Sequence, residues 1–242
     1  MATPTSAPTA ALLTDPVSQD AQLAVRSALL WGFEAVVLRE VGGERVPTVN
    51  EGRLRKQLGA SEMDVAAIAP SLFEGSSRAT WLSDAEALAE TLGFAARFGC
   101  SLVLVGAADG DPAGEAVEVL RRAAEEADAH GCRLGVWSDV HDDASVAALV
   151  HAVAHPALGA VVAPDAAAAV EPERLAGVWV GPKAVAAAEE ALTALAVSGW
   201  AGPVVLAYED RPDRTAALHL SADLIGIVRR ARRAARASGH GG

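Results

Sequence analysis

A recurring unit constrains the fold of this chain most strongly. In each copy an apolar helical pattern ends at a glycine, and a short run of branched apolar residues begins within about three residues. Clear copies occur at Gly32, Gly99, Gly131 and Gly199. Glycine ends helices well because it adopts the left-handed conformation without steric cost. The intervals of 67, 32 and 68 residues correspond to about two, one and two periods of a βα unit of roughly 33 residues.

The skipped periods also contain apolar strand patterns. We predict strands at residues 64–69 and 160–162, and further strands at 10–13 and 177–180, which brings the count to eight. Strands that alternate with helices form a parallel sheet buried on both faces. We therefore predict one (β/α)₈ barrel over residues 10–236, with a disordered tail at 1–9 and a flexible tail at 237–242.

A doubly wound open sheet is the alternative arrangement of eight such units. No Gly-x-Gly-x-x-Gly turn follows the first predicted strand, as a dinucleotide-binding sheet would require. The glycine-bearing stretch at 106–114 lacks the Gly-Lys-Ser/Thr of a phosphate loop, so we interpret it as a flexible loop. We expect no organic cofactor.

Composition and charge narrow the classes of partner. The net charge of −11 disfavours nucleic acid and anionic membranes as main partners. Every apolar run ends well short of the roughly 20 residues that a membrane span needs. The two cysteines, Cys100 and Cys132, fit neither a disulfide framework nor a zinc site, so we expect core residues in a cytoplasmic protein. A homodimer remains an open alternative.

Three stretches carry a resemblance to a known family. They are 195–206, with its Gly-Trp-Ala-Gly-Pro turn before a strand and Glu209-Asp210 beyond it; 155–164, with His-Pro-Ala-Leu-Gly before a strand; and 29–38. Together they resemble the sugar phosphate isomerase/epimerase family, the xylose isomerase-like barrels. The resemblance implies a metal-dependent isomerase or epimerase.

The resemblance also implies positions for the metal ligands, and this chain departs from them. The positions fall on Trp137, Ala163, Ala166 and Ala207, and in a His-x-His-x-Lys-like run only Lys183 matches. Alanine and tryptophan supply no lone pair that can bind a divalent ion. We therefore expect no metal at these positions, while a displaced site formed by Asp139, Asp165 and Glu209 is an alternative.

Strand alternation predicts which side chains reach the mouth of the barrel, where barrel enzymes have their active sites. If the implied ligand positions point inward, residues two positions later lie on the same face at the mouth. The predicted catalytic residues are Glu209, Asp139, Arg39, Lys183 and His141. The predicted substrate-binding residues are Trp137, Trp179, Asp165 and Glu40.

Two functions fit this pattern. The first is a metal-independent isomerase, epimerase, cyclase or lyase, which acts on a small oxygenated metabolite by carboxylate acid/base catalysis. The second is a pseudoenzyme that binds a small molecule or a partner protein without turnover. In that case the charged residues are solvated loop charges, and Trp137 and Trp179 fill the mouth instead of binding a ligand.

Overall fold

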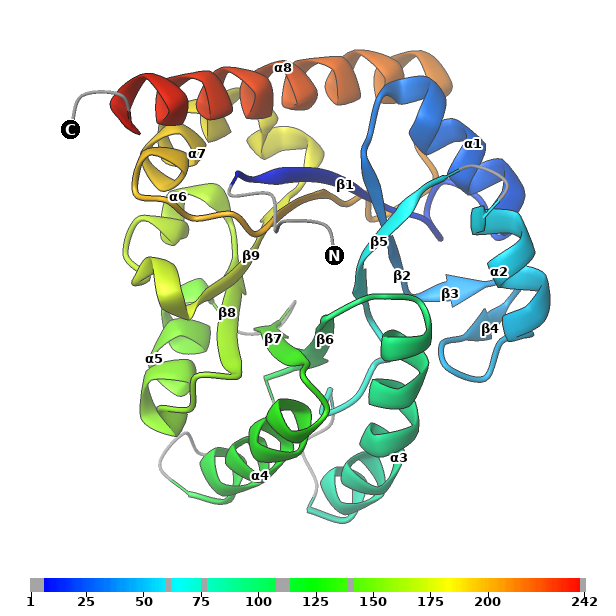
Figure 1. Cartoon of the computed structure of the whole chain (residues 1–242), viewed down its shortest axis with the longest axis vertical. Coiled ribbons are helices and arrows are strands. Elements are labelled where there is room, and N and C mark those ends of the chain that lie inside the picture. Colours follow the sequence, from blue (N-terminus) through cyan, green and yellow to red (C-terminus); the bar gives the residue numbers. More distant parts are fainter. Residues whose placement is uncertain (1–6, 60–61, 75–77, 108–113, 139–141, 240–242) are drawn as a thin grey trace.

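Eight parallel strands close into a barrel with helices around it (Figure 1). A computed structural model of the chain describes residues 7–59, 62–74, 78–107, 114–138 and 142–239. The barrel order is β1-β10-β9-β8-β7-β6-β5-β2. The strands are β1 (Thr9–Leu13), β2 (Ala35–Leu38), β5 (Asp64–Ile68), β6 (Leu102–Gly106), β7 (Arg133–Trp137), β8 (Leu158–Val162), β9 (Leu175–Val180) and β10 (Pro203–Leu206).

A helical segment follows each barrel strand before the next one begins. The α-helices are α1 (Ala21–Trp31), α2 (Glu51–Gly59), α3 (Arg78–Arg97), α4 (Glu115–Ala129), α5 (Asp143–Val153), α6 (Pro164–Ala167), α7 (Ala188–Val197) and α8 (Arg214–Gly239). Two 3-10 helices, Pro172–Arg174 and Pro182–Ala187, precede β9 and α7. The predicted (β/α)₈ barrel is confirmed.

The first strand closes the barrel. In β1, Leu12 pairs with Val36 of β2 on one side and with Leu206 of β10 on the other. The glycines that predicted the helix ends have left-handed φ values, +88° at both Gly32 and Gly199. At the end of α1, the N–H groups of Gly32 and Phe33 donate to the carbonyls of Leu29 and Ala28, which satisfies the last turn.

Two layers of apolar side chains form the core. The larger layer lies between the strands and the helices, and the smaller one fills the barrel interior. Small residues dominate the interior, among them Ala11, Ala35, Ala67 and Ala176. The larger side chains of the interior, including Leu104 and the two tryptophans Trp137 and Trp179, fill the space that these alanines leave.

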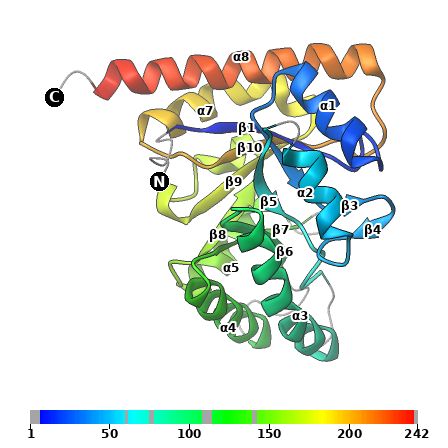
Figure 2. The same ribbon diagram turned by 45° about the vertical axis from the view of Figure 1, so that its right-hand side comes forward.

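The structure differs from the sequence-based expectation at two places along the chain. A short antiparallel hairpin, β3 (Glu40–Val41) with β4 (Glu44–Arg45), follows β2 and was not predicted. The last helix continues to Gly239, past the expected end at residue 236, and its end projects beyond the barrel (Figure 2). Within the described residues, no helix is both long enough and apolar enough to cross a bilayer.

The two cysteines lie in the core, as expected. Both are buried and neither forms a disulfide. Burial raises the pKa of the Cys100 thiol to about 12, so its thiolate is scarce at neutral pH. Cys100 therefore lacks the reactive form that a nucleophile needs.

An ion pair on α8 ties the helix to the start of the sheet. Arg232 donates to both carboxylate oxygens of Glu34, just before β2, and to the carbonyl of Pro8, just before β1. The hydrogen bonds from Arg232 lower the pKa of Glu34 from its ordinary value. The pair therefore stabilises the fold above that ordinary pKa, and its contribution is lost as the pH falls through the lowered pKa.

We expect Glu34→Gln to lower the free energy of unfolding at pH 7 by no more than about 1 kcal/mol, because the pair is partly exposed. The difference from the unmodified chain should shrink as the pH falls through the lowered pKa of Glu34, because the carboxyl then becomes protonated in both states. Urea unfolding at several pH values measures this. A difference that stays constant from pH 7 to pH 3 would show that the charge of Glu34 does not matter.

Candidate active site at the barrel mouth

A pocket of about 490 Å³ opens at the carboxyl ends of the strands. Its volume falls within the range of small-molecule sites. Apolar residues line one part of it: Leu13, Val161, Val162, Ala163, Trp137, Trp179, Pro182 and Ala207. Polar residues line the rest: Arg39, Ser138, Asp143, Tyr208 and Glu209. The site combines an indole-rich floor with one cation and two carboxyl groups.

The two indoles are stacked on each other inside the barrel, from strands that flank β8 on either side. Trp137 ends β7 and Trp179 lies in β9, and their ring centroids are 5.3 Å apart with 20° between the planes. Strand β8 runs between them and carries only small or branched residues on its inward face, such as Gly159 and Val161. Both tryptophans are half-buried and line the pocket, so part of their indole surface faces the cavity.

An ion pair fixes the cation of the site. Arg39 follows β2 and donates from Nε and Nη2 to Oδ2 of Asp15, at 2.9 and 2.6 Å. Asp15 follows β1, the neighbouring strand, and its side chain is only 12% exposed. Its second oxygen, Oδ1, is buried and has no hydrogen-bond partner within the described residues. Asp15 therefore holds Arg39 at the pocket wall and partly balances its charge.

Asp143 is a carboxyl group whose environment favours its protonated form. It is the first residue of α5, and its Oδ2 accepts a hydrogen bond from the backbone N–H of Ala163 at 3.1 Å. Burial raises the pKa of Asp143, the hydrogen bond from Ala163 opposes this rise, and the charges of Asp165 and Asp142 add to it. A carboxyl group tuned in this way suits general acid catalysis.

The neighbouring Asp142 has a structural role. It is the N-cap of α5, where its side chain accepts a hydrogen bond from the N–H of Ser145 at 2.7 Å. The cap places Asp143 inside the first turn of the helix, beside the pocket.

The structure brings four of the predicted site residues together. Arg39, Glu209, Trp137 and Trp179 all line the mouth pocket. Asp139 and His141 lie outside the described residues.

Three other predicted residues lie away from the pocket lining. Lys183 and Asp165 are exposed, because Pro182 and Pro164 begin helical segments that turn the chain off the strand direction. Glu40 belongs to the hairpin, where it accepts a hydrogen bond from Gln19 at 3.3 Å. Strand alternation was the basis of the prediction only for Asp165, and it does not hold there, because a helix begins at Pro164.

Sequence reasoning did not place Asp15 or Asp143 at the site. Each lies beyond the end of a strand, where side-chain direction depends on the loop. The only available signal was the position of Asp15 directly after the first predicted strand, parallel to that of Arg39 after the second.

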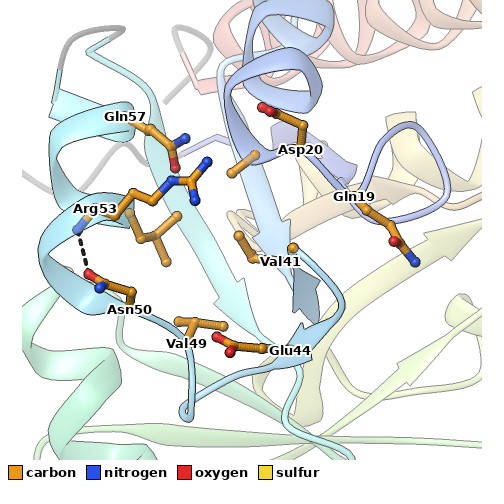
Figure 3. Close-up of a pocket in the computed structure, with 11 residues that line it drawn as sticks. Gln19, Asp20, Val41, Glu44, Val49, Asn50, Arg53 and Gln57 are labelled. Carbon is orange, nitrogen blue, oxygen red and sulfur yellow. Dashed lines mark hydrogen bonds between the residues drawn. The ribbon is translucent and has the colours of Figure 1, made fainter.

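A second cavity of about 410 Å³ lies outside the barrel ring, between the start of α1, the hairpin and α2 (Figure 3). Two of its polar side chains cap helices. Asp20 accepts hydrogen bonds from the first N–H groups of α1 at 2.8 and 3.1 Å, and Asn50 accepts one from the N–H of Arg53 at 2.9 Å. Because helix capping accounts for these oxygens, we take the mouth as the candidate site.

Comparisons with known proteins find solved structures of the same fold, and their sequence identity to this chain is low. No family model and no curated protein matches the sequence. Among solved structures, a xylose isomerase-like TIM barrel/4-hydroxyphenylpyruvate dioxygenase fusion protein is similar with a TM-score of 0.72 and 18% identity. The match covers 96% of this chain and 44% of that protein.

Two further similar structures match over their whole length. D-allulose 3-epimerase from Methylomonas sp. has a TM-score of 0.70 and 14% identity, and the match covers 96% of this chain and 100% of that one. A xylose isomerase-like TIM barrel protein from Mycobacterium smegmatis, in complex with magnesium, has a TM-score of 0.70 and 13% identity, covering 96% and 99%. The fold is that of the xylose isomerase-like barrels.

The residues at this mouth do not fit the divalent ion that the xylose isomerase-like barrels imply. Trp137 and Ala207 line the pocket where the resemblance implies carboxylate ligands, and Ala163 lines it where an aspartate is implied. Within the described ranges, no group of three His, Cys, Asp or Glu side chains could hold a metal ion. The alternative site of Asp139, Asp165 and Glu209 includes one residue outside those ranges and one, Asp165, that does not line the pocket.

Proposed function

We propose that this chain is a metal-independent enzyme of the isomerase or epimerase type, acting on a small oxygenated metabolite in the mouth pocket. The observation that supports it is the convergence of Arg39, Asp143 and Glu209 on one cavity, at the end of the barrel where enzymes of this architecture act. Ring opening, ring closure and elimination begin with the same proton transfer, so a cyclase or lyase fits the same groups.

The chemistry suited to these groups is proton transfer at a carbon next to a carbonyl. Glu209 is exposed at the mouth and serves as the base that removes the proton. Asp143, whose pKa is raised, serves as the acid that returns a proton to the substrate. Arg39 stabilises the negative charge that develops on the carbonyl oxygen. Two carboxyl groups allow the proton to be removed from one carbon and returned to another, as isomerisation requires. They also allow removal and return on opposite faces of the same carbon, as epimerisation requires.

The alternative is binding without turnover. Two observations favour it: Asp15 partly balances the charge of Arg39, and indole and methyl groups occupy the positions where metal ligands are implied. In that case the pocket retains a ligand but transfers no proton.

Deuterium exchange separates the two functions. Hydroxy ketones and oxo acids that raise the melting temperature of the protein are incubated with it in D₂O containing EDTA, and deuterium at carbon is measured by NMR. The enzyme predicts protein-dependent exchange that EDTA leaves unchanged. Binding without exchange would establish the alternative, and exchange that EDTA abolishes would overturn metal independence.

A further inference from the structure

The floor of the mouth pocket limits the substrates that it can bind. Its central surfaces are the indoles of Trp137 and Trp179, flanked by the side chains of Val161, Ala163 and Ala207. These aliphatic side chains have no hydrogen-bonding group, and each indole has only its single N–H donor. Most hydroxyl groups pressed against this floor would therefore lose their bonds to water without replacement.

The polar groups of the pocket lie elsewhere on its wall. Arg39 is held there by Asp15, which occupies Nε and Nη2, while Nη1 has no partner within the described residues. Nη1 can therefore donate to an anionic oxygen of a ligand. The pocket thus combines a flat aromatic surface with a fixed cation.

An aromatic surface favours flat ligands. A planar unsaturated ring that stacks on an aromatic side chain gains contact and quadrupole energy, which a puckered saturated ring of the same size does not gain in full. The stacked pair also stiffens the surface, since each indole restricts the other. A rigid surface loses less entropy when the ligand binds.

We propose that the substrates of this site are planar, conjugated or aromatic carboxylates, with the ring against Trp137 and Trp179 and the carboxylate near Arg39. This inference rests on the proposed function, because it assigns a substrate class to the same pocket. It suits the proposed chemistry where the substrate carries an acidic C–H group next to its conjugated carbonyl, because loss of that proton leaves a planar enolate that can stay stacked.

A matched pair of probes tests the inference on the unmodified protein. Calorimetry compares 4-hydroxybenzoate with 4-hydroxycyclohexanecarboxylate, which has the same polar groups on a puckered ring, and with D-fructose. We expect 4-hydroxybenzoate to bind at least tenfold more tightly than either. Equal binding of the two carboxylates, no measurable binding of either, or tighter binding of D-fructose would overturn the planar class.

Variants locate the binding surface. We expect Trp179→Leu and Trp137→Leu each to weaken 4-hydroxybenzoate at least fivefold, because leucine keeps an apolar surface and removes the ring. Trp31→Leu is the control, since Trp31 ends α1 and does not line the pocket. Equal affinity in all three variants would overturn the proposed surface, and melting curves confirm that each variant is folded.

The proposed substrate class and the proposed function can each fail without the other. If 4-hydroxybenzoate binds selectively but no bound planar oxo acid exchanges deuterium, the proposed ligand class is supported and the proposed enzymatic function is wrong. If deuterium enters D-fructose but 4-hydroxybenzoate does not bind selectively, the proposed enzymatic function is supported and the planar substrate class is wrong.

Discussion

Gly106→Ala is expected to lower the free energy of unfolding by about 3 kcal/mol, as measured by urea denaturation. Gly106 ends β6, and a Cβ at this position would lie 2.5 Å from the carbonyl oxygen of Phe73 and 2.7 Å from Cα of Glu74. These are backbone atoms, so they cannot move as a flexible side chain can. The N–H of Gly106 also donates to the carbonyl of Leu72 at 2.7 Å, which holds the two segments together.

The opposing segment has little freedom to retreat. Phe73 is fully buried with φ of +60°, and its N–H donates to Oδ2 of Asp84 at 2.7 Å. Gly181→Ala is the matched control, because Gly181 also follows a barrel strand but has open space at its Cβ and a φ of −71°. We expect that control to change stability by less than about 0.5 kcal/mol. If both variants lose the same stability, close backbone contact is not the cause.

The second large effect concerns the two carboxyl groups of the mouth. We expect Glu209→Gln and Asp143→Asn each to reduce the deuterium-exchange rate about 100-fold, because general acid and base groups typically contribute at least this much. The rate is measured by NMR with a substrate found in the exchange experiment. Glu125→Gln is the control, since Glu125 is an exposed carboxylate on α4 that does not line the pocket. Full activity in both mouth variants would show that these groups do not transfer the proton.

We expect Asp143→Asn to lose activity without losing stability at pH 7. The folded state raises the pKa of Asp143, so it disfavours the charged form. The contribution of this carboxyl to stability is therefore full below its unfolded pKa and is lost as the pH rises through the folded pKa. At pH 7 the neutral amide should be at least as stable as the carboxylate, and urea unfolding at pH 7 and pH 4 measures the difference. A variant that is less stable at pH 7 than at pH 4, relative to the unmodified chain, would contradict this sign.

The barrel was predictable because several helix ends have a local chemical signal. Gly32 and Gly199 mark two helix ends, and the strands that follow them, Ala35–Leu38 and Pro203–Leu206, contain no charged residue. The hairpin at Glu40–Val41 and Glu44–Arg45 has strands of two residues, too short to show alternation. The expected end of the barrel at residue 236 falls three residues before the end of α8, because Ser238 and Gly239 are weaker helix formers than alanine or arginine.

The candidate site was predictable within the strands and for Arg39 and Glu209, which lie one and three residues beyond a strand end. Trp137 and Trp179 lie within strands, so alternation placed them correctly toward the barrel interior. Arg39 lies one residue beyond β2 and reaches the pocket. Asp143 and Asp15 depend on loop paths, and their contacts with Ala163 and Arg39 join segments more than 15 residues apart in the chain. No local pattern encodes such contacts.

Metal content of the purified protein, measured by elemental analysis together with melting curves in manganese, magnesium or zinc, tests the central claim most directly. Indole and methyl groups at Trp137, Ala163 and Ala207 predict far less than one bound metal per chain and no change in melting temperature. A metal content near one per chain, with a melting temperature that rises on addition of that metal, would contradict the account.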